Sequence, residues 1–487
     1  MTEKAGFAPA AYLRISLLAQ KKGKFKEAAE AAKAAYAICN RIDMEMLEMI
    51  AKRLIRLGDF ETVDACIRSI LDSSMRRPGT LAELGKLLVD VFMPRLAVDL
   101  LSRASIQGLR TPAVDYLHGL ALTQLGEIDA ATRLIERALE HDPSLAQAHW
   151  MLSKLRKGKP EYHSIEKMER LAEKSKGLDS VILGYALFKS YDDLGDVERA
   201  WHHLERAMAL RRRGLIHDEG EERHIFQTLS EGKWSATKVP SRTGSRPIFI
   251  VGLPRSGTTL LEVLLGKHRD VTAAGELHDA VMQLRWTCDH FGGFQLDRVL
   301  IEKSLSADMG VYGARYLETT KWLAQGRRFF TDKMPSNFML VGLLARAIPD
   351  AVFLHVTRDP IDVCFSNLCE LFAGPYAYSY QQSEMASHYL NYRNLMKRWK
   401  RDHPEKILDV SYEDLVRDSR STLSKVVEFC GLDWDDTMLD GRGYASVAAT
   451  ASAIQVREPV HSRFVGRGRR YERFLQPLIS TINKGGS

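Results

Sequence analysis

Apolar side chains recur at helical spacing throughout the first 213 residues, as in the segments LGDFETVDACIRSILDSS and LGEIDAATRLIERALEHDP. Strong helix formers are abundant there, whereas Pro is scarce. Short turns interrupt the pattern about every 34 residues, with the last interval twice as long. They fall at Gly23, Gly58, Met93, Gly126 and Gly195. A further turn is expected near residues 158–160. The pattern therefore predicts an all-helical region of about six helix pairs.

This region, residues 1–213, resembles an array of tetratricopeptide repeats. Each turn is followed by small and large apolar residues that allow paired helices to nest, as at Ala130, Ala131, Leu134 and Ala138. The resemblance implies a curved solenoid whose concave face holds an acceptor peptide or a protein partner. An array that serves only to form a homodimer, or to cap the next domain, is the open alternative.

A second pattern begins after a connecting segment, residues 214–246, which ends in a polar loop. Apolar and β-branched runs predict buried strands over residues 247–251, 351–356 and 406–410. Helical stretches are expected over residues 338–347, 360–372 and 383–401. Strands alternating with helices predict a parallel α/β domain over residues 247–487. The expected fold class is thus a helical solenoid followed by an α/β domain.

Composition and charge change this picture little. The 69 basic residues oppose 62 acidic ones, and the resulting net charge of +7 does not call for nucleic acid as a partner. Six cysteines lack metal-ligand spacing, so neither a zinc site nor a disulfide framework is expected. No apolar run reaches 18 residues and no signal peptide is recognisable at Met1. We therefore expect a cytoplasmic protein without a membrane anchor.

The first predicted strand runs directly into Gly252-Leu-Pro-Arg-Ser-Gly-Thr-Thr259, followed by an apolar helical run. A strand, a glycine-rich loop and a helix N-terminus together form a phosphate cradle. Thr258 stands where a nucleoside-triphosphate P-loop needs lysine, and Arg255 lies within the loop. The loop therefore favours a ligand with one phosphate at this point over a triphosphate.

A second candidate phosphate site follows the strand at residues 351–356. Arg358 lies at the strand end, and Ser366 follows eight residues later, about two helical turns on. Both side chains can therefore converge on one phosphate. An Arg358–Asp359 surface ion pair with an unrelated helical serine is the alternative.

The motif GLPRSGTTL resembles the 5′-phosphosulfate loop of sulfotransferases in the form carried by tyrosylprotein sulfotransferases, and the likeness extends over residues 247–474. It implies 3′-phosphoadenosine-5′-phosphosulfate (PAPS) as co-substrate, with no metal required. The residues that it assigns to the 5′ phosphosulfate are Arg255, Ser256, Gly257, Thr258 and Thr259. It assigns the 3′ phosphate to Arg358 and Ser366. Glu370 departs from the family, which has a basic residue there, so the arginine-rich tail is a candidate replacement.

The resemblance also implies the catalytic groups. Glu276, 21 residues after Arg255, corresponds in position to the family's general base, with His278 as the rival base. Lys333 corresponds to the lysine that stabilises the leaving phosphosulfate oxygen, the alternative being an ion pair with Asp332. Arg255 would contribute to the same charge stabilisation.

Three later residues complete the set that the resemblance implies. Tyr412 would lie beside the nucleotide, Ser452 would donate a hydrogen bond in the transition state, and Arg463 would anchor the nucleotide. The sequence thus predicts a PAPS-dependent sulfotransferase whose acceptor hydroxyl, on a peptide tyrosine, carbohydrate, lipid or small molecule, is not specified. A P-loop kinase or ATPase, and an inactive repeat scaffold, remain the alternatives.

Overall fold

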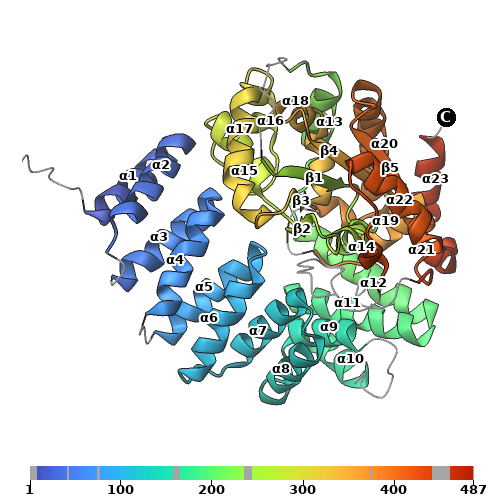
Figure 1. The fold of residues 1–487 in the computed structure, drawn as a ribbon. Coiled ribbons are helices and arrows are strands. Elements are labelled where there is room, and N and C mark those ends of the chain that lie inside the picture. Colours follow the sequence, from blue (N-terminus) through green and yellow to red (C-terminus); the bar gives the residue numbers. More distant parts are fainter. Residues whose placement is uncertain are drawn as a thin grey trace, which may run out of the picture.

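The computed structural model (Figure 1) describes residues 8–40, 43–73, 77–156, 165–234, 244–372, 374, 376–440 and 461–485. Two regions follow each other along the chain. The first contains helices only, and the second is built around a five-stranded sheet. The predicted fold class is confirmed.

The first region is a succession of helix pairs. Its helices are α1 (Pro9–Lys21), α2 (Phe25–Ile38), α3 (Met44–Leu57), α4 (Phe60–Asp72), α5 (Pro78–Asp90), α6 (Pro94–Ile106), α7 (Pro112–Leu125), α8 (Ile128–His141), α9 (Ala146–Leu155), α10 (Ile165–Lys174), α11 (Gly177–Leu194) and α12 (Val197–Arg213). Gly126 and Gly195 end helices in the left-handed conformation, as the turn pattern predicts. The turn expected near residues 158–160 lies outside the described residues.

The paired helices approach closely because small residues face large ones. A Cβ atom added at Gly119 of α7 would lie 2.8 Å from Ile135 of α8, so only glycine fits there without movement. Leu47, Ile67, Leu88 and Leu100 are fully buried between successive pairs. Because each pair buries its apolar face against the next, the array curves as one continuous body.

The connecting segment contains a helix that the sequence pattern did not indicate. α13 (Glu219–Glu231) buries Ile225, Phe226 and Leu229 against the second region. Asp218 caps it by accepting hydrogen bonds from the first-turn backbone. Its three first-turn glutamates favour a helix N-terminus.

The sheet of the second region is entirely parallel, with strand order β2-β3-β1-β4-β5. The strands are β1 (Arg246–Val251), β2 (Val271–Ala273), β3 (Phe329–Asp332), β4 (Val352–Thr357) and β5 (Ile407–Ser411). Ile248 of the central strand pairs with Thr331 on one side and Val352 on the other. Three of these strands were predicted, whereas β2 and β3 were too short to give a pattern.

Helices cover both faces of the sheet. They are α14 (Thr258–Leu265), α15 (Asp279–Thr287), α16 (Arg298–Ser304), α17 (Met309–Thr320), α18 (Val341–Ala347), α19 (Pro360–Leu368), α20 (Gln382–Asp402), α21 (Tyr412–Arg417), α22 (Ser419–Cys430) and α23 (Gln476–Lys484). On one face Ile250 and Leu354 pack under α14 and α22. On the other, Phe249 and Phe353 pack under α17, α18 and α20. Both faces are therefore dry, as a parallel sheet requires.

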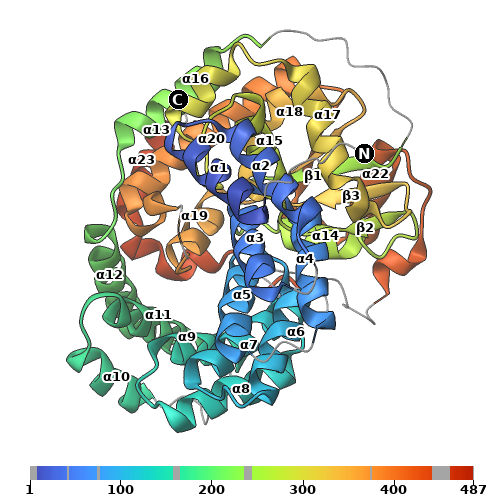
Figure 2. The ribbon, with the colours of Figure 1, turned by 90° about the vertical axis from the view of Figure 1, so that its left-hand side faces the viewer.

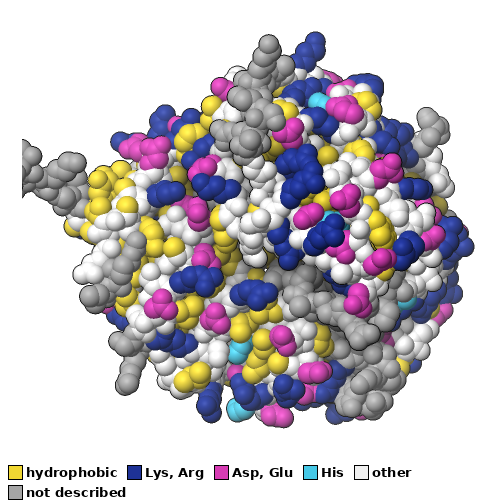
Figure 3. Space-filling view, viewed as in Figure 1, with side chains coloured by type: hydrophobic (Ala, Val, Ile, Leu, Met, Phe, Trp, Pro, Cys, Tyr) yellow, Lys and Arg dark blue, Asp and Glu magenta, His cyan; other side chains and the backbone are white. Residues whose placement is uncertain are grey.

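The array bends around the sheet region so that both of its ends contact that region (Figures 1 and 2). α2 contacts α15, and α12 contacts the 3-10 helices η4 (Ala377–Tyr380) and η7 (Arg467–Phe474). Basic and acidic side chains are interspersed on the face shown in Figure 3. No helix in the described ranges is both long and apolar enough to cross a membrane.

Candidate active site

The candidate residues follow the ends of five neighbouring strands. Because the strands are parallel, their carboxyl ends lie at one edge of the sheet, where open α/β sheets bind ligands. Reading along this edge from β2 to β5 gives Glu276, Lys333, the loop at residues 252–257, Arg358 and Tyr412. The strand order thus places the candidate catalytic pair on one side of the loop and the candidate nucleotide contacts on the other.

The loop after β1 has the shape of a phosphate cradle. Gly252 and Gly257 have φ angles of 153° and 110°, and Arg255 adopts a left-handed φ of 67°. α14 begins at Thr258, so its first backbone N–H groups point out of the loop. The Ser256 hydroxyl is buried and has no hydrogen-bond partner within the described part of the chain. The loop therefore offers donors that an oxyanion would satisfy.

Glu276 and Lys333 form an ion pair. The Lys333 Nζ donates to Glu276 Oε1 over 2.7 Å, with Lys333 fully buried and Glu276 16% exposed. Asp332, the partner considered from sequence, instead accepts hydrogen bonds from Tyr316 and Asn337. The alternative Lys333–Asp332 pair is therefore wrong, because Asp332 points back into the core.

The buried carboxyl of Glu262 holds the backbone beside this pair. This residue was not identified from the sequence. Glu262 of α14 accepts hydrogen bonds from the Gly275 backbone N–H at 2.9 Å and from Thr331 Oγ1 at 2.7 Å. The Lys333 backbone N–H donates to Gly275 O. Burial raises the pKa of Glu262. A lone charge within the apolar run Leu260–Leu265 was the signal that could have identified it.

Arg358 and the helix after it are both attached to the loop. The Arg358 Nη1 donates to Arg255 O at 3.0 Å, and the Asn367 amide donates to Pro254 O at 2.8 Å. Ser366 is buried on the same helix, α19. Asp359 caps that helix through two backbone N–H groups, so the proposed Arg358–Asp359 surface pair is wrong. The structure thus brings the second candidate phosphate site next to the first.

Tyr412 packs directly on the loop. A Cβ atom added at Gly257 would lie 2.4 Å from the Tyr412 ring, so the contact requires glycine. The Arg358 guanidinium lies 4.6 Å from the centre of the same ring. This aromatic side chain therefore joins the two candidate phosphate sites.

Two candidates lie in the C-terminal segment. Ser452 is outside the described residues. Arg463 is exposed, with its guanidinium 5.0 Å from the Phe464 ring. Phe464 O accepts a hydrogen bond from Arg358. The segment that carries Arg463 therefore reaches the second candidate phosphate site.

His278, the rival base, faces away from this edge. Its ring stacks on Phe294 at 4.3 Å and lies near Phe60 and Phe92 of the helical array. Burial lowers the pKa of His278 to about 4. The side chain therefore forms part of the contact with the repeats, whereas Glu276 pairs with Lys333 at the edge of the sheet.

Glu370, which stands where the resemblance implies a basic residue, has its ion-pair partner in the repeat array. Glu370 pairs with Lys154 of α9, with 2.9 Å between Nζ and Oε1. The arginine-rich tail turns toward the array too. Arg467 and Arg470 pair with Asp192 of α11. These two arginines bind the array, whereas the sequence had suggested the tail as a phosphate contact.

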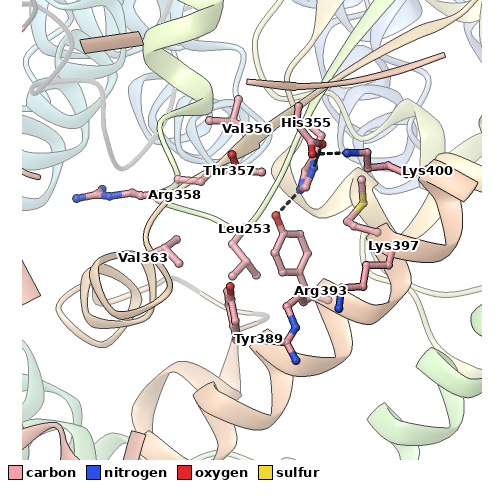
Figure 4. A pocket seen from close by; sticks show the side chains of 14 residues that line it. Leu253, His355, Val356, Thr357, Arg358, Val363, Tyr389, Arg393, Lys397 and Lys400 are labelled. Carbon is pink, nitrogen blue, oxygen red and sulfur yellow. Dashed lines mark hydrogen bonds and ion pairs between the residues drawn. The ribbon is translucent and has the colours of Figure 1, made fainter. Parts of the chain in front are cut away.

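A cavity of about 210 Å³ lies behind the loop, between β4 and α20 (Figure 4). Ser256 and His355 line one side, and Tyr389, Arg393 and Lys397 of α20 line the other. Arg358 also lines the cavity, and its side chain points away from α20 in Figure 4. The cavity thus adjoins the loop and Arg358, whereas Glu276 and Lys333 are not among its lining residues.

Comparison with known proteins identifies this second region. Residues 247–436 match the model of the sulfotransferase family. The chain therefore carries a sulfotransferase-family domain behind a tetratricopeptide-like array. It is similar to protein-tyrosine sulfotransferase 2 of Gallus gallus, with 24% identity over 252 residues, which cover 48% of this chain and 62% of the relative.

A protein of Aquifex aeolicus, described as uncharacterized, is 30% identical over 315 residues, covering 62% of this chain and 41% of that protein. The match thus spans less than two thirds of each of these two relatives. Among solved structures, the sulfotransferase domain of the Synechococcus PCC 7002 olefin synthase aligns with 18% identity and a TM-score of 0.32. That alignment covers 52% of this chain and 98% of the domain.

Proposed function

We propose that this protein transfers the sulfuryl group of PAPS to an acceptor hydroxyl and releases adenosine 3′,5′-bisphosphate. One observation carries the proposal, namely the order of groups along the sheet edge. A base and a lysine lie on one side of a phosphate loop, and an arginine, a serine and a tyrosine lie on the other. This order matches an in-line transfer in which acceptor, sulfuryl group and nucleotide follow one another.

The donor fits the groups at the edge. The loop backbone and the first turn of α14, with Thr258 and Thr259, would hold the 5′ phosphosulfate. Arg358 and Ser366 would hold the 3′ phosphate, and Tyr412 would contact the nucleoside. The Nε of Arg358 is buried without a hydrogen-bond partner among the described residues, as expected of a group that awaits an anion.

The ion pair between Glu276 and Lys333 supplies the chemistry. When the donor binds, Lys333 would turn to the bridging oxygen and stabilise the charge that develops there as the S–O bond breaks. Glu276 would then accept the proton of the acceptor hydroxyl while the hydroxyl oxygen attacks sulfur. The ion pair thus holds the two side chains together until the donor replaces Glu276 as the partner of Lys333.

A peptide tyrosine is the acceptor that we propose. The support is the similarity to a protein-tyrosine sulfotransferase and the presence of a helical array of a kind that binds peptides. The test is to incubate the purified protein with PAPS labelled with radioactive sulfur and a library of tyrosine peptides. Transfer to tyrosine, absent in Glu276→Gln, is expected; transfer only to carbohydrate or small phenols would contradict the peptide acceptor.

A further inference from the structure

The end of helix α19 connects the candidate donor loop to the repeat array. Ser366, a proposed 3′-phosphate contact, is buried, and the amide of the next residue, Asn367, donates a hydrogen bond to Pro254 O in the loop. One residue further, Leu368 O accepts a hydrogen bond from the Tyr185 hydroxyl of α11 at 3.2 Å. The turn at residues 366–370 is therefore held by the loop on one side and by the array on the other.

The contact with α9 is an ion pair buried between the two regions. Lys154 and Glu370 have side chains that are only 17% and 8% exposed. The Lys154 ammonium also lies 4.9 Å from the centre of the Trp150 ring, which packs against Tyr185. A buried carboxylate that loses its paired cation pays a large desolvation penalty, so loss of Lys154 would displace Glu370 and the turn that carries it.

We propose that Lys154 and Tyr185 of the repeat array are positioning residues of the donor site. They hold the α19 turn against the loop, and Lys154 neutralises the buried Glu370 at the end of that turn. The array is then part of the donor-binding machinery as well as a binding surface for acceptors. This inference rests on the proposed function, because it assumes that the loop binds PAPS.

The test compares the binding of adenosine 3′,5′-bisphosphate to the full-length protein and its variants by calorimetric titration. We expect Lys154→Met to weaken binding roughly tenfold, a size typical of mutations that act through an intervening residue. Lys154→Arg keeps the cation and should bind within about twofold of wild type. The double variant Lys154→Met/Glu370→Gln removes both charges and should regain most of the lost affinity, because no unpaired buried carboxylate remains to displace the turn.

Arg212→Met is the matched control. Arg212 pairs with Glu384, whose side chain is 3% exposed, and joins the array to the first turn of α20, away from α19. Its loss should destabilise the contact between the two regions while leaving bisphosphate affinity unchanged. Melting temperatures of all variants verify that each is folded.

The possible outcomes separate the two claims. If wild type binds the bisphosphate and Lys154→Met binds equally well, the positioning role is wrong and the proposed function stands. Equal weakening in Lys154→Met and Arg212→Met, or no recovery in the double variant, would likewise overturn it, since both results indicate general loosening. If folded wild type does not bind the bisphosphate at all, the proposed function itself fails.

Discussion

The two ends of the repeat array contact the sulfotransferase domain with different chemistry. At the N-terminal end the contact is mainly apolar and aromatic, and it also includes Asp289, which pairs with Lys24 and accepts a hydrogen bond from the Lys26 backbone N–H. His278 lies among phenylalanine rings from the array and from the domain, and Met282 packs so tightly against Gly58 that an added Cβ atom would lie 2.6 Å away. This contact adjoins Glu276, the proposed base.

At the C-terminal end buried ion pairs and hydrogen bonds are added to an aromatic contact, in which rings of α11 and α12 pack on rings of η7. Lys154 pairs with Glu370, and Asp192 accepts hydrogen bonds from Arg467 and from the Tyr471 hydroxyl. Although burial opposes it, Arg467 holds the pKa of Asp192 below its usual value. This contact adjoins the proposed donor site.

This difference indicates that the two contacts have different structural roles. Apolar contact is non-directional and supplies cohesion, whereas charged hydrogen bonds fix geometry. The array is thus expected to stabilise the domain at its acceptor end and to align phosphate-binding groups at its donor end. The following predictions test these two roles, in order of decreasing effect.

Replacing the proposed base gives the largest effect. Glu276→Gln removes the proton acceptor but keeps the shape and a hydrogen-bond acceptor for Lys333, so turnover should fall about 10³-fold. Binding of adenosine 3′,5′-bisphosphate should change less than about threefold, because Glu276 lies on the far side of the loop. Steady-state kinetics and calorimetry check the two values, and a large loss of affinity would refute the assigned order of groups.

Removal of the arginine at the 3′-phosphate site comes next. Arg358→Ala should weaken bisphosphate binding by about 1.5–3 kcal/mol, the usual value of a hydrogen bond to a charged group. The catalytic pair is untouched, so turnover at saturating donor should stay within about tenfold of wild type. A purely catalytic defect with normal donor affinity would show that Arg358 is misassigned.

At the apolar contact, His278 should make stability depend on pH. The folded protein holds this ring uncharged because burial lowers the pKa of His278 to about 4, whereas an unfolded histidine takes up its proton near pH 6.5. Wild type therefore loses stability as the pH falls from about 6.5 toward 4. Between pH 7 and pH 5 the loss due to His278 should be about 2 kcal/mol.

His278→Phe provides the comparison for that prediction. The variant keeps the aromatic packing and cannot be protonated, so the difference in unfolding free energy between it and wild type should shift by the same amount over this pH range. Urea unfolding at both pH values measures the shift. An unchanged difference would mean that the ring is not held in its neutral form.

The smallest effect is expected from an exposed pair at the ionic contact. Arg473 pairs with Glu198, but the two side chains are 59% and 66% exposed. Glu198→Ala should change the free energy of unfolding by less than about 0.5 kcal/mol. Thermal unfolding measures this change. A loss as large as that of Arg212→Met would show that burial does not set the strength of these pairs.

Much of the fold could be predicted from the sequence because its signals are local. Helical periodicity marks the array, and the strand before Gly252 and the strand before Arg358 are continuous apolar runs. β2 and β3 have only three and four residues, and β3 ends in the buried Asp332, so neither gives a recognisable pattern.

Part of the candidate site could likewise be predicted from the sequence, and part of it could not. The loop and the Arg358–Ser366 spacing are contiguous, and the sequence alone pointed to phosphate binding there. The pairing of Lys333 with Glu276 depends on which strands are neighbours, and the pairing of Lys154 with Glu370 spans 216 residues. Contacts between distant segments leave no periodic signal, so these pairs required the structure.

The most direct test of the central claim is a calorimetric titration of the full-length protein with adenosine 3′,5′-bisphosphate, with ATP and Mg²⁺ as the comparison. A loop that holds one phosphate, with a second phosphate site at Arg358, predicts tight binding of the bisphosphate and none of ATP. Binding of ATP alone, or of neither nucleotide by folded protein, would contradict the account.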